Sequence, residues 1–207
     1  MTPDETNTAP PFSAPEEASN GVDLFRLLRN THIFASVVHQ TLERDLVTEV
    51  SPRPLSTSQF HLIRLLSLYG CRSVRQAADF LGVSPPAASK SIDKLVKLGL
   101  VLREPSPGDR RATRLSVSDI GRRLVRRYEA LKSDRLAGVL EHFQPEEIEQ
   151  LTDLMERFSV SVLSRSQDNQ RSCLFCGAYI TEECPIRQFR GGCPYLKARG
   201  GDAVESV

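Results

Sequence analysis

Residues 73–117 read SVRQAADFLGVSPPAASKSIDKLVKLGLVLREPSPGDRRATRLSV and carry the strongest structural signal of the chain. Ser73 and Ser84 each precede a short segment whose apolar residues recur at helical spacing, and serine is a favoured N-cap residue. A glutamine at the capping-box position supports the first helix, and a proline at the first helical position supports the second. The pattern predicts helices over residues 74–81 and 85–98, joined by a tight turn.

A β-hairpin is predicted directly after these helices. Gly99 ends the second helix, and residues 100–103 and 113–117 have the pattern of strands on either side of a turn rich in Pro and Gly. The order helix, turn, helix, hairpin is that of a winged helix-turn-helix. We expect its small core to consist of Ala77, Ala78, Leu81, Val83, Ile92, Leu95 and Val96.

Long helices are predicted on both sides of this lobe. Apolar residues recur at helical spacing over 22–50, until the prolines of residues 51–54 end the helix. Ser56 or Ser58 then caps a helix over 59–69. Two further helices are predicted over 118–143 and 145–164. Because the outer helices are apolar on more than one side, we expect them to contact a partner subunit.

The sequence therefore predicts a mainly α fold with a small cysteine-rich module at its end. Its expected parts are a disordered tail at 1–20, a dimerisation helix at 21–54, the winged helix-turn-helix lobe at 55–117, dimerisation helices at 118–165 and the cysteine-rich module at 172–199. The tail holds four prolines and four acidic residues but no Lys or Arg, which is unlike a secretory signal. The chain also lacks an apolar run of about 18 residues. We expect a cytoplasmic protein without a membrane partner.

Charge is distributed unevenly along the 207 residues, although the net charge is only +1. Residues 84–127 contain eleven Lys and Arg against four acids, whereas residues 141–156 contain six acids and no Lys or Arg. A basic module that coincides with a helix-turn-helix pattern is typical of a DNA-binding protein. The second helix of such a motif places its N-terminal half in the major groove. The residues expected on the exposed face of that half are Ser84, Pro86, Ala87, Ser89, Lys90, Ser91 and Lys94.

Two stretches resemble the MarR family of winged-helix regulators. Residues 84–101 (SPPAASKSIDKLVKLGLV) look like its recognition helix, and residues 103–121 (REPSPGDRRATRLSVSDIG) look like its wing and the start of the next helix. The resemblance covers about residues 22–164. It implies a homodimer, a palindromic double-stranded DNA operator, transcriptional regulation, most simply repression, and no catalysis. It also implies that a small phenolic or acidic ligand can be a partner.

Candidate DNA-binding residues come from the two helices, the hairpin and the helix N-termini. In the wing, the resemblance implies that Asp109 pairs with a neighbouring Arg, and that Arg110 or Arg111 enters the minor groove. Helix N-termini near Ser58 and Ser73 are expected to present backbone N–H groups to phosphates. The full candidate set is Ser58, Ser73, Ser84, Pro86, Ser89, Lys90, Lys94, Arg103, Asp109, Arg110 and Arg111.

The C-terminal segment departs from the family pattern because it holds four of the five cysteines. They are Cys173, Cys176, Cys184 and Cys193. Four thiolates within 21 residues suit a tetrahedral metal or a [4Fe–4S] cluster. The last two cysteines each precede a proline, as a cluster ligand does in bacterial ferredoxins, which favours the cluster. Structural zinc is the alternative, and disulfides or free thiols are a third interpretation.

These features predict a regulator whose operator affinity depends on a [4Fe–4S] cluster that senses redox state, oxygen, nitric oxide or iron. A small-ligand-responsive regulator with a structural zinc tail is the runner-up. An Fe–S electron-transfer protein is the alternative from another class. It is disfavoured because the sequence contains neither a G-x-G-x-x-G motif nor a P-loop for a second cofactor.

Overall fold

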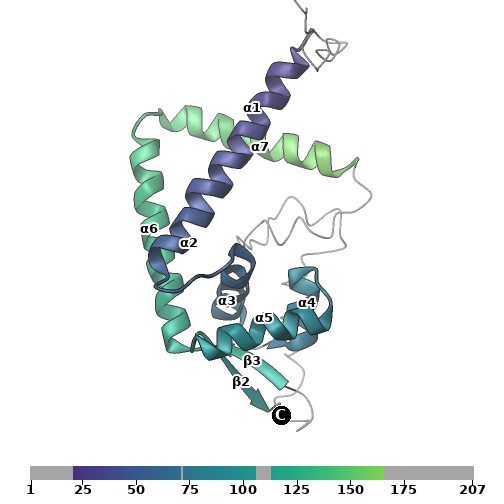
Figure 1. The fold of residues 1–207 in the computed structure, drawn as a ribbon. Coiled ribbons are helices and arrows are strands. Elements are labelled where there is room, and N and C mark those ends of the chain that lie inside the picture. Colours follow the sequence, from purple (N-terminus) through teal and green to yellow (C-terminus); the bar gives the residue numbers. More distant parts are fainter. Residues whose placement is uncertain (1–20, 71, 106–112, 166–207) are drawn as a thin grey trace, which may run out of the picture. The chain divides into compact units, whose positions relative to one another are not determined.

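The computed structural model describes residues 21–70, 72–105 and 113–165 (Figure 1). Its elements are α1 (Leu24–Val37), the π-helix η1 (Val38–Arg44), α2 (Asp45–Val50), α3 (Thr57–Tyr69), β1 (Arg72–Ser73), α4 (Val74–Leu81), α5 (Pro85–Lys97), β2 (Val101–Pro105), β3 (Thr113–Val117), α6 (Asp119–Leu140) and α7 (Pro145–Leu163). The fold is mainly helical with one small antiparallel sheet, as predicted. The tail predicted at 1–20 and the cysteine-rich module predicted at 172–199 lie outside the described residues. Within the described ranges, no helix combines the length and the apolarity that a membrane crossing requires.

The chain divides into two compact units between Glu43 and Arg44. The first unit contains α1, which Asp23 caps by accepting a hydrogen bond from the Arg26 N–H (2.8 Å). No residue of α1 is buried within this unit. A helix with this much uncovered apolar surface needs another surface to pack against. Its exposed large apolar side chains are Phe25, Leu27, Leu28, Ile33, Phe34 and Val37.

The single helix predicted over 22–50 is wrong in one respect, because a π-helix at Val38–Arg44 interrupts it. A π-helix widens the turn, so that side chains before and after it face different directions than they would in an uninterrupted α-helix. The apolar residues Val38, Leu42 and Leu46 are four apart, which suits either kind of turn. The spacing alone therefore does not reveal the change.

Side-chain caps define the helices of the lobe in the second unit. Ser56, rather than Ser58, caps α3 and forms a capping box with Gln59, so the helix begins two residues earlier than predicted. Ser73 forms the same box with Gln76 at the start of α4, as predicted. Gly82 then ends α4 in the left-handed conformation, with φ at 63°.

The predicted hairpin is present as β2 and β3, which pair antiparallel with Val101 opposite Val117 and Pro105 opposite Thr113. The strand β2 is displaced from the predicted residues 100–103 to Val101–Pro105. The sequence did not predict β1, which adds only two residues to the far edge of β3 and makes the sheet order β1-β3-β2. Figure 1 shows the hairpin next to α5, with which β2 is in contact.

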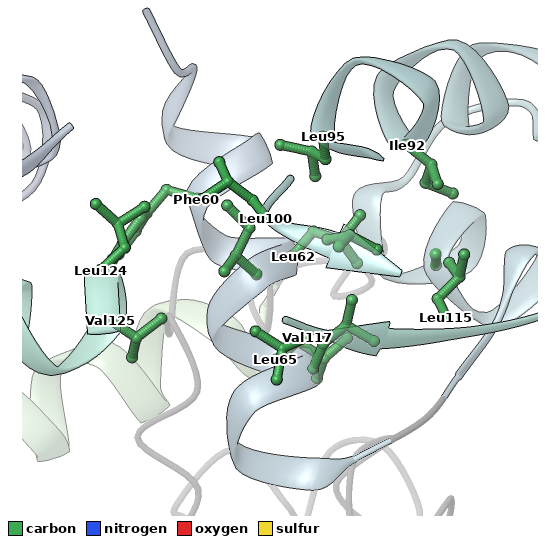
Figure 2. Packing of buried hydrophobic residues seen from close by; sticks show 14 of the residues in the cluster. Phe60, Leu62, Leu65, Ile92, Leu95, Leu100, Leu115, Val117, Leu124 and Val125 are labelled. Carbon is green, nitrogen blue, oxygen red and sulfur yellow. The ribbon is translucent and has the colours of Figure 1, made fainter. Parts of the chain in front are cut away.

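The core of the lobe lies where α3, α5, the hairpin and the first half of α6 meet. Figure 2 shows side chains from these elements converging, among them Leu62 and Leu65 of α3, Leu95 of α5 and Val125 of α6. On the α3–α6 side, the rings of Phe60 and Tyr128 are 4.4 Å apart between centroids. The predicted core residues Ala77, Ala78, Leu81, Ile92 and Leu95 are buried, and Val96 is partly buried.

Val83 was predicted to be in the core, but its side chain is 44% exposed. The residue contributes its backbone instead, because its N–H donates to the Ala78 carbonyl (3.2 Å) and so closes the turn after α4. This hydrogen bond satisfies a carbonyl at the end of the helix, and the side chain stays on the surface of the turn.

A junction at Ser118 joins α6 to the lobe. The Ser118 hydroxyl donates to the Gly99 carbonyl (2.6 Å) and accepts from the Gly121 N–H (3.0 Å), while the Ser118 N–H donates to the Leu100 carbonyl (3.1 Å). One residue therefore caps α6 and ties it to the end of α5. Gly121 is buried here, and a Cβ on it would lie 2.4 Å from the Leu100 oxygen and 2.7 Å from Val117 Cγ2.

Replacing Gly121 by alanine should destabilise the lobe. The added methyl group meets backbone, which cannot rotate away, so we expect a loss of about 1–3 kcal/mol in the free energy of unfolding. Gly138→Ala is the matched control, because it lies in the same helix and a Cβ there would have nothing within 4 Å. That variant should be neutral or more stable by up to about 1 kcal/mol. Urea unfolding at equal protein concentration measures both, and equal stabilities would contradict the close packing at Gly121.

Candidate nucleic-acid interface

The first turn of α5 has an apolar surface. Ser84 is the N-cap residue, and Pro85 and Pro86 occupy the first two helical positions. Pro86 and Ala87 are exposed, whereas Ala88 begins the buried face that continues through Ile92. Because proline has no N–H, this turn offers fewer backbone donors than a usual helix N-terminus.

Two lysines follow on the exposed face of α5. Lys90 and Lys94 are one turn apart, and both are exposed. Among the described residues, neither ammonium group forms an ion pair within 4.0 Å. Lys97 is also exposed and lies at the opposite end of the helix. The positive charge of this face is therefore available to an anionic partner.

The two serines beside these lysines are occupied by contacts within the lobe. Ser89 and Ser91 are both half-buried. The Ser91 hydroxyl accepts a hydrogen bond from Gln59 Nε2 of α3 (3.3 Å), and the Ser89 hydroxyl accepts one from Arg103 of β2 (3.3 Å). Both were expected on the exposed face, and both are only partly exposed, because Ser91 faces α3 and Ser89 faces Arg103 of β2.

Arg103 links the hairpin to α5. Its guanidinium lies 2.7 Å from Asp93 Oδ1 and also contacts Ser89, so that one side chain on β2 holds two positions on α5. Asp93 is absent from the site residues predicted from the sequence. The signal that could have identified it is the presence of one acidic residue among the lysines of this helix. Together with the Gln59–Ser91 bond, these contacts fix the orientation of α5 at its sides.

The two residues predicted at helix N-termini, Ser58 and Ser73, occupy different positions in their helices. Ser58 is an exposed residue of the first turn of α3, since Ser56 is the cap. Ser73 is half-buried, and its hydroxyl accepts from the Gln76 N–H (3.1 Å) while the Gln76 side chain accepts from the Ser73 N–H (2.8 Å). Asp109, Arg110 and Arg111 of the wing lie outside the described residues.

The basic start of α6 contains one local ion pair. Arg122 donates to Asp119 Oδ1 (2.7 Å) and to the Val117 carbonyl (3.1 Å). The hydrogen bond and then the charge of Arg122 lower the pKa of the Asp119 carboxyl below its usual value. This contact therefore stabilises the fold above the usual pKa of an aspartate, and its contribution is lost as the pH falls through the lowered value.

A pocket of about 300 Å³ lies beside α6 and borders the end of α5. Three cationic side chains, Arg53, Arg123 and Arg127, line it together with apolar residues that include Leu98 and Leu124. Arginines beside an apolar wall suit an organic anion with a hydrophobic body. The predicted metal ligands Cys173, Cys176, Cys184 and Cys193 lie outside the described residues, in which no group of three or more potential ligands is found.

Asp93→Asn distinguishes a positioning role of Arg103 from a direct contact with DNA. If Arg103 acts by holding β2 against α5, both Asp93→Asn and Arg103→Ala should lower DNA affinity, by up to about fivefold given the exposed pair. If Arg103 mainly binds phosphate, Asp93→Asn should raise the affinity, since it removes a negative charge and releases the guanidinium. Fluorescence anisotropy with labelled duplex at constant salt measures the sign, and we expect a decrease for both variants.

Comparison with known proteins agrees with this geometry. The model of the MarR family matches residues 55–113. Similar solved structures include RV1404 from Mycobacterium tuberculosis (22% identity, TM-score 0.60, covering 75% of this chain and 99% of that one). Others are YusO from Bacillus subtilis (20%, 0.54, 67% and 98%) and MepR, a transcription regulator of the Staphylococcus aureus multidrug efflux pump MepA (16%, 0.54, 64% and 97%). Proteins of the MarR family are transcription regulators and not enzymes. The match to the MarR family model thus covers the part of the chain that contains α3, α4, α5 and β2, and the solved structures share the fold of this chain.

Proposed function

We propose that this chain is a sequence-specific DNA-binding transcriptional regulator, most simply a repressor, that acts in the cytoplasm as a homodimer on a palindromic operator. The observation that carries the proposal is the exposed face of α5, where Lys90 and Lys94 have no acidic partner among the described residues while the opposite face is held in the core. Such a face combines a fixed orientation with the positive charge that phosphates attract.

Uncovered apolar surface supports the dimer. MarR regulators bind DNA operators and act as dimers. In this chain, no residue of α1 is buried, and none of α7 is buried either. Large apolar side chains are exposed on α7, including Leu151, Leu154 and Phe158. A second copy of the chain would remove this surface from water, and the symmetry of such a dimer would match a palindromic site.

Lys90→Ala with Lys94→Ala should weaken DNA binding and reduce its dependence on salt. Each lost phosphate contact lowers the slope of log affinity against log salt by about 0.9. Lys97→Ala is the control for the single variants Lys90→Ala and Lys94→Ala, because each removes one positive charge from the same helix, and we expect the change in Lys97→Ala to be smaller. Binding isotherms at several salt concentrations measure this. Equal losses for the control and for the single variants would contradict the placement of the N-terminal half of α5 at the DNA.

The proposal extends to the four cysteines of the tail, which would hold a [4Fe–4S] cluster that modulates operator affinity. The support is the donor set itself: Cys173 and Cys176 form a close pair, and Cys184 and Cys193 each precede a proline. Because a bound cluster stabilises the fold of the segment that holds it, its loss would change the structure that follows the last dimerisation helix.

Protein purified without oxygen should be brown and contain iron and sulfide in equal amounts. Cluster-loaded and apo protein should then differ in operator affinity by about 5–150-fold at matched salt, the range of a typical coupling between sites. A colourless protein with one zinc per chain would establish the structural zinc alternative, and equal affinities of loaded and apo protein would exclude sensing by the cluster. A Cys184→Ser variant checks that the metal content depends on this set.

Regulation by a small molecule is the second candidate, and the arginine-lined pocket favours it. A small aromatic acid would place its carboxylate among Arg53, Arg123 and Arg127 and its ring against Leu98 and Leu124. Because the pocket borders the end of α5, such a ligand would contact this helix and change its orientation toward DNA. Release of DNA by such acids in the wild type, but not in Arg123→Gln, is the result that this candidate requires.

A further inference from the structure

The surface at the N-terminal end of α5, the end that is proposed to enter DNA, is apolar. Val83 lies in the turn before the helix, and Pro85, Pro86 and Ala87 form its first three positions. All four side chains are exposed, and the Ser84 hydroxyl is the single polar side-chain group between them. An exposed apolar patch bordered by charged residues is typical of a surface that contacts another molecule.

The hydroxyl groups on the next turn each accept one hydrogen bond within the lobe. Ser89 accepts from Arg103, and Ser91 accepts from Gln59, both at 3.3 Å. The exposed side chains at the N-terminal half of α5 are the apolar group at its start, the N-cap Ser84 and the two lysines. The apolar group has no side-chain hydrogen-bonding atoms, so any base contact that its side chains make is an apolar one.

The major groove presents one apolar feature to a protein, which is the C5-methyl group of thymine. Small apolar side chains such as alanine contact that methyl group in DNA complexes. We infer that Pro86 and Ala87 determine specificity by packing on thymine methyl groups in each half-site, while Lys90 and Lys94 contact phosphates or guanine. This inference rests on the proposed DNA-binding function and adds which base feature the helix reads.

Charge complementarity favours DNA over a protein partner as the occupant of this patch. Lys90 follows the apolar group within one helical turn, and Lys94 lies one turn beyond it. An apolar protein groove over this surface would leave the neighbouring cations unpaired, whereas in DNA they meet phosphates. The contacts of Ser89 and Ser91 also keep the patch in one orientation.

Thymine-to-uracil substitution tests the inference, because it removes the methyl group and leaves base pairing unchanged. An operator is first selected from a random duplex pool with the full-length protein. Each thymine of a half-site is then replaced by uracil in turn, and affinities are compared at one salt concentration. We expect at least one position per half-site at which loss of the methyl weakens binding by about fourfold, the value of one buried methyl-sized group.

The second part of the test repeats these measurements with the protein variant Ala87→Gly, with Lys97→Ala as the matched control. Ala87→Gly should reduce the thymine-to-uracil affinity ratio at that position towards 1, and Lys97→Ala should keep the full ratio even if its absolute affinity falls. Circular dichroism checks that both variants are folded, and the ratio is measured within each variant, so a general loss of affinity cancels.

The outcomes separate this inference from the proposed function. If the protein selects and binds an operator but no uracil substitution changes its affinity, recognition of thymine methyl groups is wrong and DNA binding stands. If the ratio in Ala87→Gly equals that of the wild type, another residue contacts the methyl group and the assignment to Ala87 is overturned. If no duplex is selected over the random pool, the proposed function fails together with the inference.

Discussion

The junction around Ser118 fixes the geometry of the lobe. A single residue caps α6, accepts from Gly121, and bonds the Gly99 and Leu100 carbonyls at the end of α5. Gly121 brings the helix backbone so close to Leu100 that no side chain fits between them. The helix that leaves the lobe is thereby attached to the helix and hairpin that would read DNA. The start of α6 and the end of α5 are therefore joined by hydrogen bonds as well as by the chain between them.

The helix α5 is held on several sides. Its residues Ala88, Ile92 and Leu95 are buried in the core, the Gln59 side chain of α3 donates to Ser91, and Arg103 of β2 pairs with Asp93 and donates to Ser89. None of these exposed or half-exposed polar contacts contributes much energy alone, since surface pairs are worth at most about 1 kcal/mol. Their value lies in removing alternative orientations before binding, which lowers the entropy cost that binding would otherwise carry.

The remaining surface divides into parts of different chemistry. Exposed apolar side chains on α1 and on α7 are suited to contact with another protein surface, and the exposed lysines of α5 are suited to binding an anion. The arginine-lined pocket beside α6 has both cationic and apolar lining residues, and one of these is Leu98 at the end of α5. In the proposed function, the dimer places two recognition helices, and signals from the pocket or the cysteine tail alter how they are presented to the operator.

Local signals in the sequence were sufficient to predict most elements of the lobe. The capping box of Ser73, the left-handed Gly82, the proline at the start of α5 and the paired strands of the hairpin each act over a few residues. The set of four cysteines is likewise a property of the sequence and stays a prediction. Which residues these polar side chains contact became clear only from the folded chain. Ser91 was expected on the exposed face of α5 and Arg103 among the DNA-binding residues, and their partners Gln59 and Asp93 are 32 and 10 residues away, respectively. The exposure of Val83, the strand β1 and the close approach at Gly121 also depend on neighbours that folding brings together, because packing is set by distances in space that no local spacing encodes.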